Sequence, residues 1–274
     1  MNKITLVGMD GTKGKELNLP SQFSESFRPD LIKRAVLVVQ SHNIQPSGTN
    51  PDAGKKQSSK ISKRRKDFKT TYGRGQSRTP RKILSRRGTN FYYMGAFAPN
   101  TVGGRVSHPP KAEKIWDLKM NIQERRKAIR SAIAATMNPE IVKRRGHRVE
   151  SLVVDSKVEE LKKTKDVLEF MNKIGFEKEI ERVAEKKIRS GKGKNRGRPY
   201  RKKVGPLFVV SKKCSLMRSA INLNGVDICT VKDLNAELLA PGTDAGRLTV
   251  WSEKALEIMD KEKLFYTKEN KKWI

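Results

Sequence analysis

The spacing of apolar residues changes along the chain and predicts its elements. Lys3–Val7 alternates as a strand does, Gly8–Gly11 suits a turn, and Lys15–Leu19 is a second short strand, so the chain opens with a hairpin. A helix begins at Arg28–Asp30, because proline suits the first turn of a helix and aspartate favours its positive end. We expect this helix to end before Pro46.

A second helix is expected over Asn121–Met137. Asn121 can cap it, Glu124 stands three residues later as in a capping box, and Pro139 ends it. Its apolar face consists of Ile122, Ile129, Ala132, Ile133 and Met137. Its basic face consists of Arg125, Arg126, Lys127 and Arg130. That basic face is either a solvated surface or an RNA contact, and the basic segments elsewhere in the chain favour RNA.

From Leu152 onward, strands alternate with helices. The expected strands are Leu152–Asp155, Leu207–Ser211, Val226–Val231 and Leu248–Trp251. The expected helices are Val158–Ile174, Glu177–Ile188, Leu216–Leu223, Asp233–Leu239 and a last one that Ser252 caps and that ends at Asp260. Continuous apolar strands separated by helices need cover on both faces. The sequence therefore predicts a single α/β domain over residues 1–274, a three-layer α/β/α body around a mainly parallel sheet.

Two long segments interrupt this body and follow no hydrophobic period. In the first, residues 44–111, the most charged part is Lys55–Arg87, which has too few apolar side chains for a core that could offset the entropy of ordering it. We expect an extended loop that is disordered until it binds a partner. The second segment, residues 186–205, is a second basic insertion. The tail, residues 261–274, carries rings that need a surface to cover them, either this protein's own or a neighbour's.

The distribution of charge indicates the partner. The chain has 274 residues and a formal charge of +31. Lys55–Arg87 carries +13, with 14 Lys or Arg and one acid, Lys186–Lys203 carries +10, and the other 223 residues share +8. Basicity concentrated in two limbs of a folded body is typical of phosphate contacts. A polyanion is therefore the expected partner.

The second half of the long loop mixes rings with basic side chains. It carries Phe91, Tyr92, Tyr93, Met94, Phe97 and Val102 beside Arg86, Arg87, Arg105 and His108. Such mixing is typical of an RNA-facing surface, because bases stack on rings and guanidinium planes. The alternative, open for each ring, is that it packs the base of the loop onto the body.

An α/β sheet often carries an enzyme, but this sequence lacks a convergent set of acid, base and nucleophile. It has no Walker pattern, and Gly191–Gly197 has the wrong spacing for a dinucleotide loop. Its three histidines share no zinc-like spacing with acids or cysteines. Glu177, Glu179 and Glu181 are expected on the solvated face of a helix. A catalytic function is not expected.

The two cysteines, Cys214 and Cys229, fit no metal or redox spacing. They are expected to be reduced core thiols of a cytosolic protein. The cations of Lys212–Lys213 would lower the pKa of Cys214, which has no histidine partner nearby. No apolar run is long enough to span a membrane, and the N-terminal residues lack the apolar region of a signal peptide.

Six blocks of the sequence resemble a known family. They are Phe27–Ala35, Tyr72–Gly75, Gly103–Arg105, His108–Lys111, Gln123–Ala135 and Asn195–Arg201. The blocks are similar to those of the large-subunit ribosomal protein L four family in its archaeal form, and the resemblance covers nearly the whole chain. Thr49–Lys66 departs from the family pattern, with more Lys and Ser and fewer rings.

The resemblance implies a non-catalytic constituent of the large ribosomal subunit in the cytoplasm. Such a protein binds 23S-type rRNA, supports subunit assembly and sends an extended loop to the wall of the polypeptide exit tunnel. The implied partners are large-subunit rRNA, neighbouring ribosomal proteins and nascent peptide, with no membrane and no small-molecule substrate. No cofactor is implied other than Mg²⁺ that belongs to the rRNA. By position the loop tip falls in Tyr72–Thr89, and Arg74, Arg78 and Arg81 are the tunnel-wall candidates.

The expected RNA-binding residues form three groups. In the loop they are Lys55, Lys56, Lys63, Arg64, Arg65, Lys66, Tyr72, Arg74, Arg78, Arg81, Lys82, Arg86, Arg87, Tyr92, Arg105, His108 and Lys111. On the helix they are Arg125, Arg126 and Arg130, and in the second insertion they are Lys192, Lys194, Arg196, Arg198, Tyr200, Arg201 and Lys202. Two rival hypotheses are an RNA-processing α/β enzyme, for which catalytic residues are missing, and a DNA packer, which would carry its basic segments at the chain ends.

Overall fold

The computed structural model describes residues 3–59, 65–66, 73, 75–88 and 90–266. Its internal contacts divide the chain into two units. The first, called the body, is Met1–Asn43 with Asp117–Ile274, and the second, called the arm, is Ile44–Trp116. The loop expected over residues 44–111 falls within the arm, and residues 267–274 of the expected tail lie outside the described residues.

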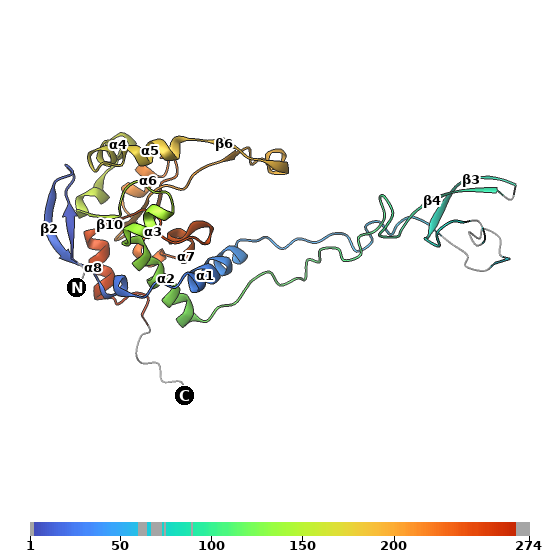
Figure 1. Cartoon of the computed structure of the whole chain (residues 1–274), viewed down its shortest axis with the longest axis horizontal. Coiled ribbons are helices and arrows are strands. Elements are labelled where there is room, and N and C mark those ends of the chain that lie inside the picture. Colours follow the sequence, from blue (N-terminus) through green and yellow to red (C-terminus); the bar gives the residue numbers. More distant parts are fainter. Residues whose placement is uncertain (1–2, 60–64, 67–72, 74, 89, 267–274) are drawn as a thin grey trace, which may run out of the picture. The chain divides into compact units, whose positions relative to one another are not determined.

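The body contains a six-stranded sheet in the order β2-β1-β5-β10-β8-β9 (Figure 1). Its strands are β1 Lys3–Val7, β2 Lys13–Asn18, β5 Leu152–Val154, β8 Leu207–Val210, β9 Asp227–Thr230 and β10 Thr249–Ser252. The pair β1 and β2 is the predicted antiparallel hairpin, and every other neighbouring pair is parallel. The predicted mainly parallel sheet is confirmed.

Helices cover both faces of this sheet. They are α1 Pro29–His42, α2 Ile122–Thr136, α3 Pro139–Arg144, α4 Thr164–Lys173, α5 Glu177–Ala184, α6 Leu216–Ala220, α7 Ala236–Leu239 and α8 Glu253–Lys261. Short 3-10 turns occur at η1 Ser21–Ser24, η2 Ser156–Glu160, η3 Gly191–Arg196, η4 Val231–Asp233 and η5 Pro241–Thr243. Buried residues of α1, α2, α7 and α8 belong to one apolar cluster, whereas those of α4 and α6 belong to another.

Alternation along the central strand β8 separates the two clusters. Leu207 and Val209 pack into the first cluster, and Phe208 and Val210 into the second, as expected for successive strand residues. All four are buried, and each such side chain contributes about 1.5–3 kcal/mol of hydrophobic stabilisation. Trp251 adds an edge-on ring contact with Phe23, 5.2 Å between centroids. Two cores on one sheet confirm the α/β/α layering.

Four predicted helices are shorter in the structure. The helix expected over Leu216–Leu223 ends at Ala220, and the one expected over Asp233–Leu239 begins at Ala236. Val158–Ile174 is split into η2 and α4, because the backbone of Leu161 is extended and the carboxylate of Glu159 accepts hydrogen bonds from Ser211. The helix expected over Glu177–Ile188 ends at Ala184, after which the chain enters the short strand β6 Lys187–Ile188. Strand β6 pairs with β7, Tyr200–Arg201, and η3 lies between them. The second insertion is therefore a small hairpin.

The predicted N-terminal cap residues lie at the starts of their helices, but not all of them make the capping hydrogen bond. The side chain of Asn121 accepts a hydrogen bond from Gln123 N at 3.0 Å, as predicted for α2. Pro139 opens α3 after α2 has ended at Thr136. Ser252 occupies the N-cap of α8, but its hydroxyl makes no capping hydrogen bond. Ile122, expected on the apolar face of α2, is 65% exposed.

The arm contains a hairpin that the sequence did not predict, β3 Arg81–Arg87 paired with β4 Asn90–Gly95. Lys55–Arg87 was expected to be part of an extended loop without regular structure, and at β3 that expectation was wrong. Ile83 pairs with Tyr93 and Ser85 pairs with Tyr92, so a register shift falls at Leu84. Such a bulge adds one residue to a strand and reverses its alternation, which hides the strand period from a sequence pattern.

Candidate RNA interface

The hairpin of the arm has one packed face and one open face. Phe91 and Tyr93 stack with centroids 6.0 Å apart, and the guanidinium of Arg86 lies 5.6 Å from the centre of the Phe91 ring. On the opposite face, Tyr92 is 64% exposed and Met94 is 46% exposed. Phe91 and Tyr93 therefore pack within the hairpin, whereas Tyr92 has the exposure that base stacking requires.

A tight turn over Ala96–Arg105 holds Arg105 in place. Arg105 N donates to Phe97 O at 3.3 Å, and its guanidinium lies 5.6 Å from the centre of the Phe97 ring. Phe97 has a φ of 67°, a left-handed conformation that is unusual for a side chain of this size. Gly104 allows the close approach, because a Cβ there would lie 2.0 Å from Ala98 O. The turn thus positions one of the expected RNA-binding arginines.

The predicted arm residues differ in how the structure places them. Exposed ones are Lys55, Lys56, Arg65, Lys66, Arg78, Arg86, Arg87, Tyr92, His108 and Lys111, and half-buried ones are Arg81, Lys82 and Arg105. The guanidinium of Arg81 donates to the hydroxyl of Ser77 at 2.7 Å and also to the carbonyl oxygen of Ser77. The candidates Lys63, Arg64, Tyr72 and Arg74 lie outside the described residues.

Arg130 on α2, one of the expected RNA-binding residues, makes its contacts within the body. Its Nε donates to Glu25 at 2.8 Å, its Nη1 donates to Phe265 O at 2.7 Å, and its guanidinium lies 4.6 Å from the centre of the Tyr266 ring. Only 14% of the side chain is exposed. Arg130 therefore ties α2 to the segments before α1 and after α8. Arg125 is exposed and Arg126 is half-buried.

The second insertion presents its basic side chains to solvent. Lys192, Lys194, Arg196, Arg198, Tyr200, Arg201 and Lys202 are all exposed. The side chain of Arg189 instead braces the hairpin, with Nε donating to Arg198 O at 3.2 Å and Nη2 donating to Tyr200 O at 3.3 Å. Gly197 closes the turn with a φ of 76°. The hairpin thus displays a row of cations on a braced backbone.

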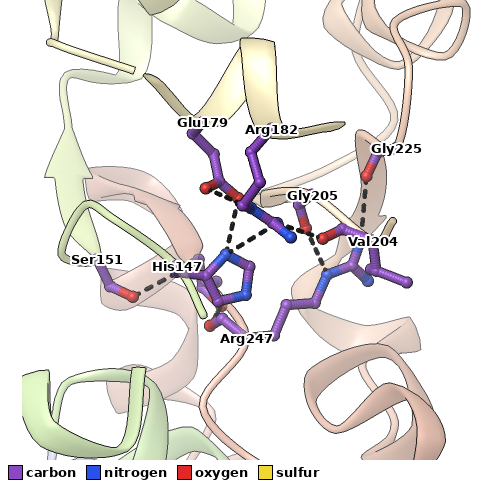
Figure 2. A network of polar contacts seen from close by, with 9 residues as sticks. His147, Ser151, Glu179, Arg182, Val204, Gly205, Gly225 and Arg247 are labelled. Atoms are coloured by element: carbon purple, nitrogen blue, oxygen red, sulfur yellow. Dashed lines mark hydrogen bonds and ion pairs between the residues drawn. The ribbon is translucent and has the colours of Figure 1, made fainter. Parts of the chain in front are cut away.

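A buried polar network lies at the base of this insertion (Figure 2). His147 Nδ1 lies 2.7 Å from Glu179 Oε1, and Arg182 donates to both oxygens of Glu179 at 2.6 and 2.9 Å. Arg182 also donates to Val204 O at 2.7 Å. An ionised carboxylate only accepts hydrogen bonds, so His147 Nδ1 is the donor in its contact with Glu179. Nη2 of Arg182 lies 3.3 Å from the same Nδ1 and donates to Glu179 at 2.6 Å. The network joins the segment after α3, helix α5 and the end of the insertion.

Glu179 was expected on a solvated helix face, and that expectation was wrong. Its side chain has no exposed surface. Burial alone would raise the pKa of Glu179, but the hydrogen bonds from His147 and Arg182 outweigh it and lower that pKa to about 2. The partner His147 lies 32 positions away in the chain, so no local pattern indicated that this glutamate is buried.

A second buried cation, Arg247, also makes hydrogen bonds at the base of the second insertion. Its Nε donates to Gly205 O at 2.9 Å and its Nη1 donates to Leu238 O at 3.0 Å, while Nη2 pairs with Asp227. Burial lowers the pKa of Arg247, and the charge of Asp227 opposes this shift. Together with Arg182, this side chain fixes the point where the insertion rejoins the body.

The rest of the described chain offers little for catalysis. Among the residues that the structure describes, no three His, Cys, Asp or Glu side chains gather as a metal site would require. Burial raises the pKa of Cys214, contrary to the lowering expected from its neighbouring lysines, and raises that of Cys229 to about 12. Both thiols are free. Within the same described ranges, no helix has the length and apolar character to cross a membrane.

Comparison with known proteins identifies the family. Residues 17–262 match the model of the Ribosomal protein L4/L1 family. The chain is 47% identical to Large ribosomal subunit protein uL4 of Nanoarchaeum equitans over 96% of this chain and 100% of that protein. It is 45% identical to the uL4 protein of Archaeoglobus fulgidus, over 94% of this chain and 98% of that one. For Methanocaldococcus jannaschii uL4 the identity is 46%, over 93% and 97%. The chain therefore belongs to the Ribosomal protein L4/L1 family, in its archaeal form.

Proposed function

We propose that this chain is a structural constituent of the large ribosomal subunit, in the cytoplasm, and not an enzyme. Relatives that match it over nearly their full length are named as large-subunit proteins. The observation that carries the proposal is the combination of a two-faced α/β/α core with two displayed basic segments, the arm and the second insertion. Such a protein binds 23S-type rRNA and supports the assembly of the subunit.

Binding rests on phosphate neutralisation. Each Lys or Arg that neutralises a phosphate releases counterions from the RNA, so the affinity falls as the salt concentration rises. Each neutralised phosphate makes the slope of log affinity against log salt concentration steeper by about 0.7–0.9. The exposed cations of the arm act in this way, and Tyr92 stacks on a base. Arg125 and Arg126 extend the contact onto α2, and Mg²⁺ enters only as an ion of the rRNA.

The arm reaches the wall of the polypeptide exit tunnel. Arg74, Arg78 and Arg81 are the residues we assign to that wall, where they meet the nascent peptide. Support comes from family membership and from the exposure of Arg78. Residues 186–205 hold another rRNA segment, and neighbouring large-subunit ribosomal proteins are further partners of the chain. In the tail, Leu264 and Phe265 pack against the body itself.

Co-sedimentation with large subunits washed in high salt tests the proposal. Thr49 N donates to Pro110 O at 3.1 Å, so a short glycine linker can replace residues 50–109 without straining the two ends. We expect the full chain to stay with the subunits and the chain without its arm to be released at lower salt. Complete loss of the full chain in the wash would overturn the proposal, and circular dichroism of the shortened chain controls for folding.

A further inference from the structure

The body has a basic cleft that shares His147, Arg182 and Val204 with the buried network of Figure 2. Its volume is about 680 Å³, and seven Lys or Arg and two acidic residues line it. The cations come from four places in the sequence: the end of α3, helix α5, strand β6, and strand β7 with the residues after it. This convergence is a property of the fold, and the sequence pattern gave no sign of it.

Two of these arginines are fixed in the wall. Arg145 donates to Pro241 O at 2.6 Å and also to Asp244 O. Arg182 is held by Glu179 and by Val204 O. Burial lowers the pKa of Arg145 to about 10, and the nearby charges of Arg247 and Arg182 add to this. An anion in the cleft would relieve that repulsion without any rearrangement of the wall.

Other cations of the cleft are free to bind a ligand. Arg144, Arg201 and Lys202 are exposed, and no carboxylate among the described residues lies within ion-pair distance of them. Lys203 pairs with Glu185 at 2.6 Å, but the two side chains are 35% and 64% exposed. Exposed pairs of this kind contribute little to stability, so an incoming anion can replace Glu185 as the partner.

We propose that this cleft, formed by Arg144, Arg145, Arg182, Arg201 and Lys202, binds the phosphodiester backbone of an RNA segment, as a site separate from the arm. The proposal rests on the RNA-binding function proposed above and adds the α3 and α5 arginines to it. Guanidinium groups form paired hydrogen bonds with phosphate and with carboxylate oxygens alike, so the choice of phosphate rests on the proposed function, which makes rRNA the partner of this chain. An acidic protein segment is the alternative that the experiment must separate.

The test uses the full chain and a charge-neutralised variant, Arg144→Gln/Arg201→Gln/Lys202→Gln. These side chains are exposed, so the variant folds, as its unfolding curve will show. The matched control, Lys13→Gln/Lys157→Gln/Lys254→Gln, removes three equally exposed charges elsewhere on the body. Binding to purified 23S-type rRNA is measured over a range of salt concentrations.

We expect the cleft variant to lower the slope of log affinity against log salt by about 2, and the control to lower it by less than half of that. Equal losses for the two variants would overturn the cleft while leaving the proposed function intact. Failure of the unaltered chain to bind rRNA would instead overturn the proposed function. Loss of polyglutamate binding with unchanged rRNA binding would assign the cleft to an acidic protein and overturn the RNA site.

Discussion

The guanidinium of Arg182 donates a 2.7 Å hydrogen bond to the carbonyl oxygen of Val204 and so joins helix α5 to the far end of the basic insertion. The same side chain is paired with the fully buried Glu179, which also contacts His147. The second insertion carries cations that repel one another. The buried charges of Glu179 and Arg182 hold the two ends of this insertion on the body. This arrangement lets a basic hairpin be displayed without loosening the sheet beneath it.

The buried carboxylate of Glu179 should be essential for stability. Glu179→Ala leaves the charge of Arg182 and the ring of His147 buried without their acceptor, which costs about 3–5 kcal/mol. Urea unfolding followed by circular dichroism measures this loss. Glu181→Ala, on the exposed side of the same helix, is the control and should change stability by about 0.5 kcal/mol or less. Equal midpoints for both variants would contradict a structural role for the network.

The same carboxylate should make stability depend on pH. The pKa of Glu179 falls from 4.5 to about 2 on folding, so its contribution is complete above about pH 5 and is lost as pH falls toward 2. The shift corresponds to about 3 kcal/mol. Urea midpoints between pH 6 and pH 2 measure it. Glu179→Gln cannot titrate, so its curve should lack this component; an unchanged curve would refute the assignment.

Two arginines of α2 should give opposite results. Arg130→Gln removes the partner of Glu25 and a donor to Phe265 O, so we expect a loss of about 1–3 kcal/mol in stability with rRNA affinity unchanged for the folded protein. Arg125→Gln, at an exposed position, should weaken rRNA binding and leave stability unchanged. Thermal unfolding and filter binding on the same samples separate the two effects. If the folded Arg130→Gln variant bound rRNA more weakly than the unaltered chain, Arg130 would belong to the RNA interface.

Local sequence patterns predicted the strands and helices of the body, because residues close together in the sequence determine these elements. The continuous apolar run of Leu207–Val210 and the capping asparagine Asn121 are set by near neighbours, and both appear as expected. The polar contacts of the body depend on partners remote in sequence. Glu25 lies 105 positions from Arg130, and Glu179 lies 32 positions from His147. Charge alone therefore suggested solvent or RNA for side chains that in fact pair inside the protein.

The basic cleft could not be predicted from the sequence either, because its residues are also remote from one another in the chain. Arg144 and Arg145 lie at the end of α3, a helix that the sequence pattern did not predict, and nothing near them indicated that Arg201 and Lys202 would line the same cleft. The hairpin of the arm escaped prediction for a different reason, the extra residue at Leu84 that reverses the alternation. The basic segments themselves were visible from composition, because charge density does not depend on the fold.

In the free protein, Lys55–Arg87 should lack the dispersed amide signals of a folded segment. A two-stranded hairpin is marginally stable alone in water, and the repulsion among its cations opposes compaction. A ¹⁵N-correlation spectrum of the full chain at low salt tests this. Sharp, dispersed signals across that segment would contradict it. On adding 23S-type rRNA fragments, new signals or strong broadening should appear there first.

The turn over Ala96–Arg105 should depend on a single glycine. In Gly104→Ala the new methyl group would meet Ala98 O at 2.0 Å, so the turn must open and Arg105 must lose its place beside Phe97. We expect shifted amide signals from Ala96 to Arg105 and weaker rRNA binding, with the thermal midpoint of the body unchanged. Ser107→Ala, at a nearby exposed position, is the control. If the Gly104→Ala spectrum matches that of the unaltered chain, the turn does not position Arg105.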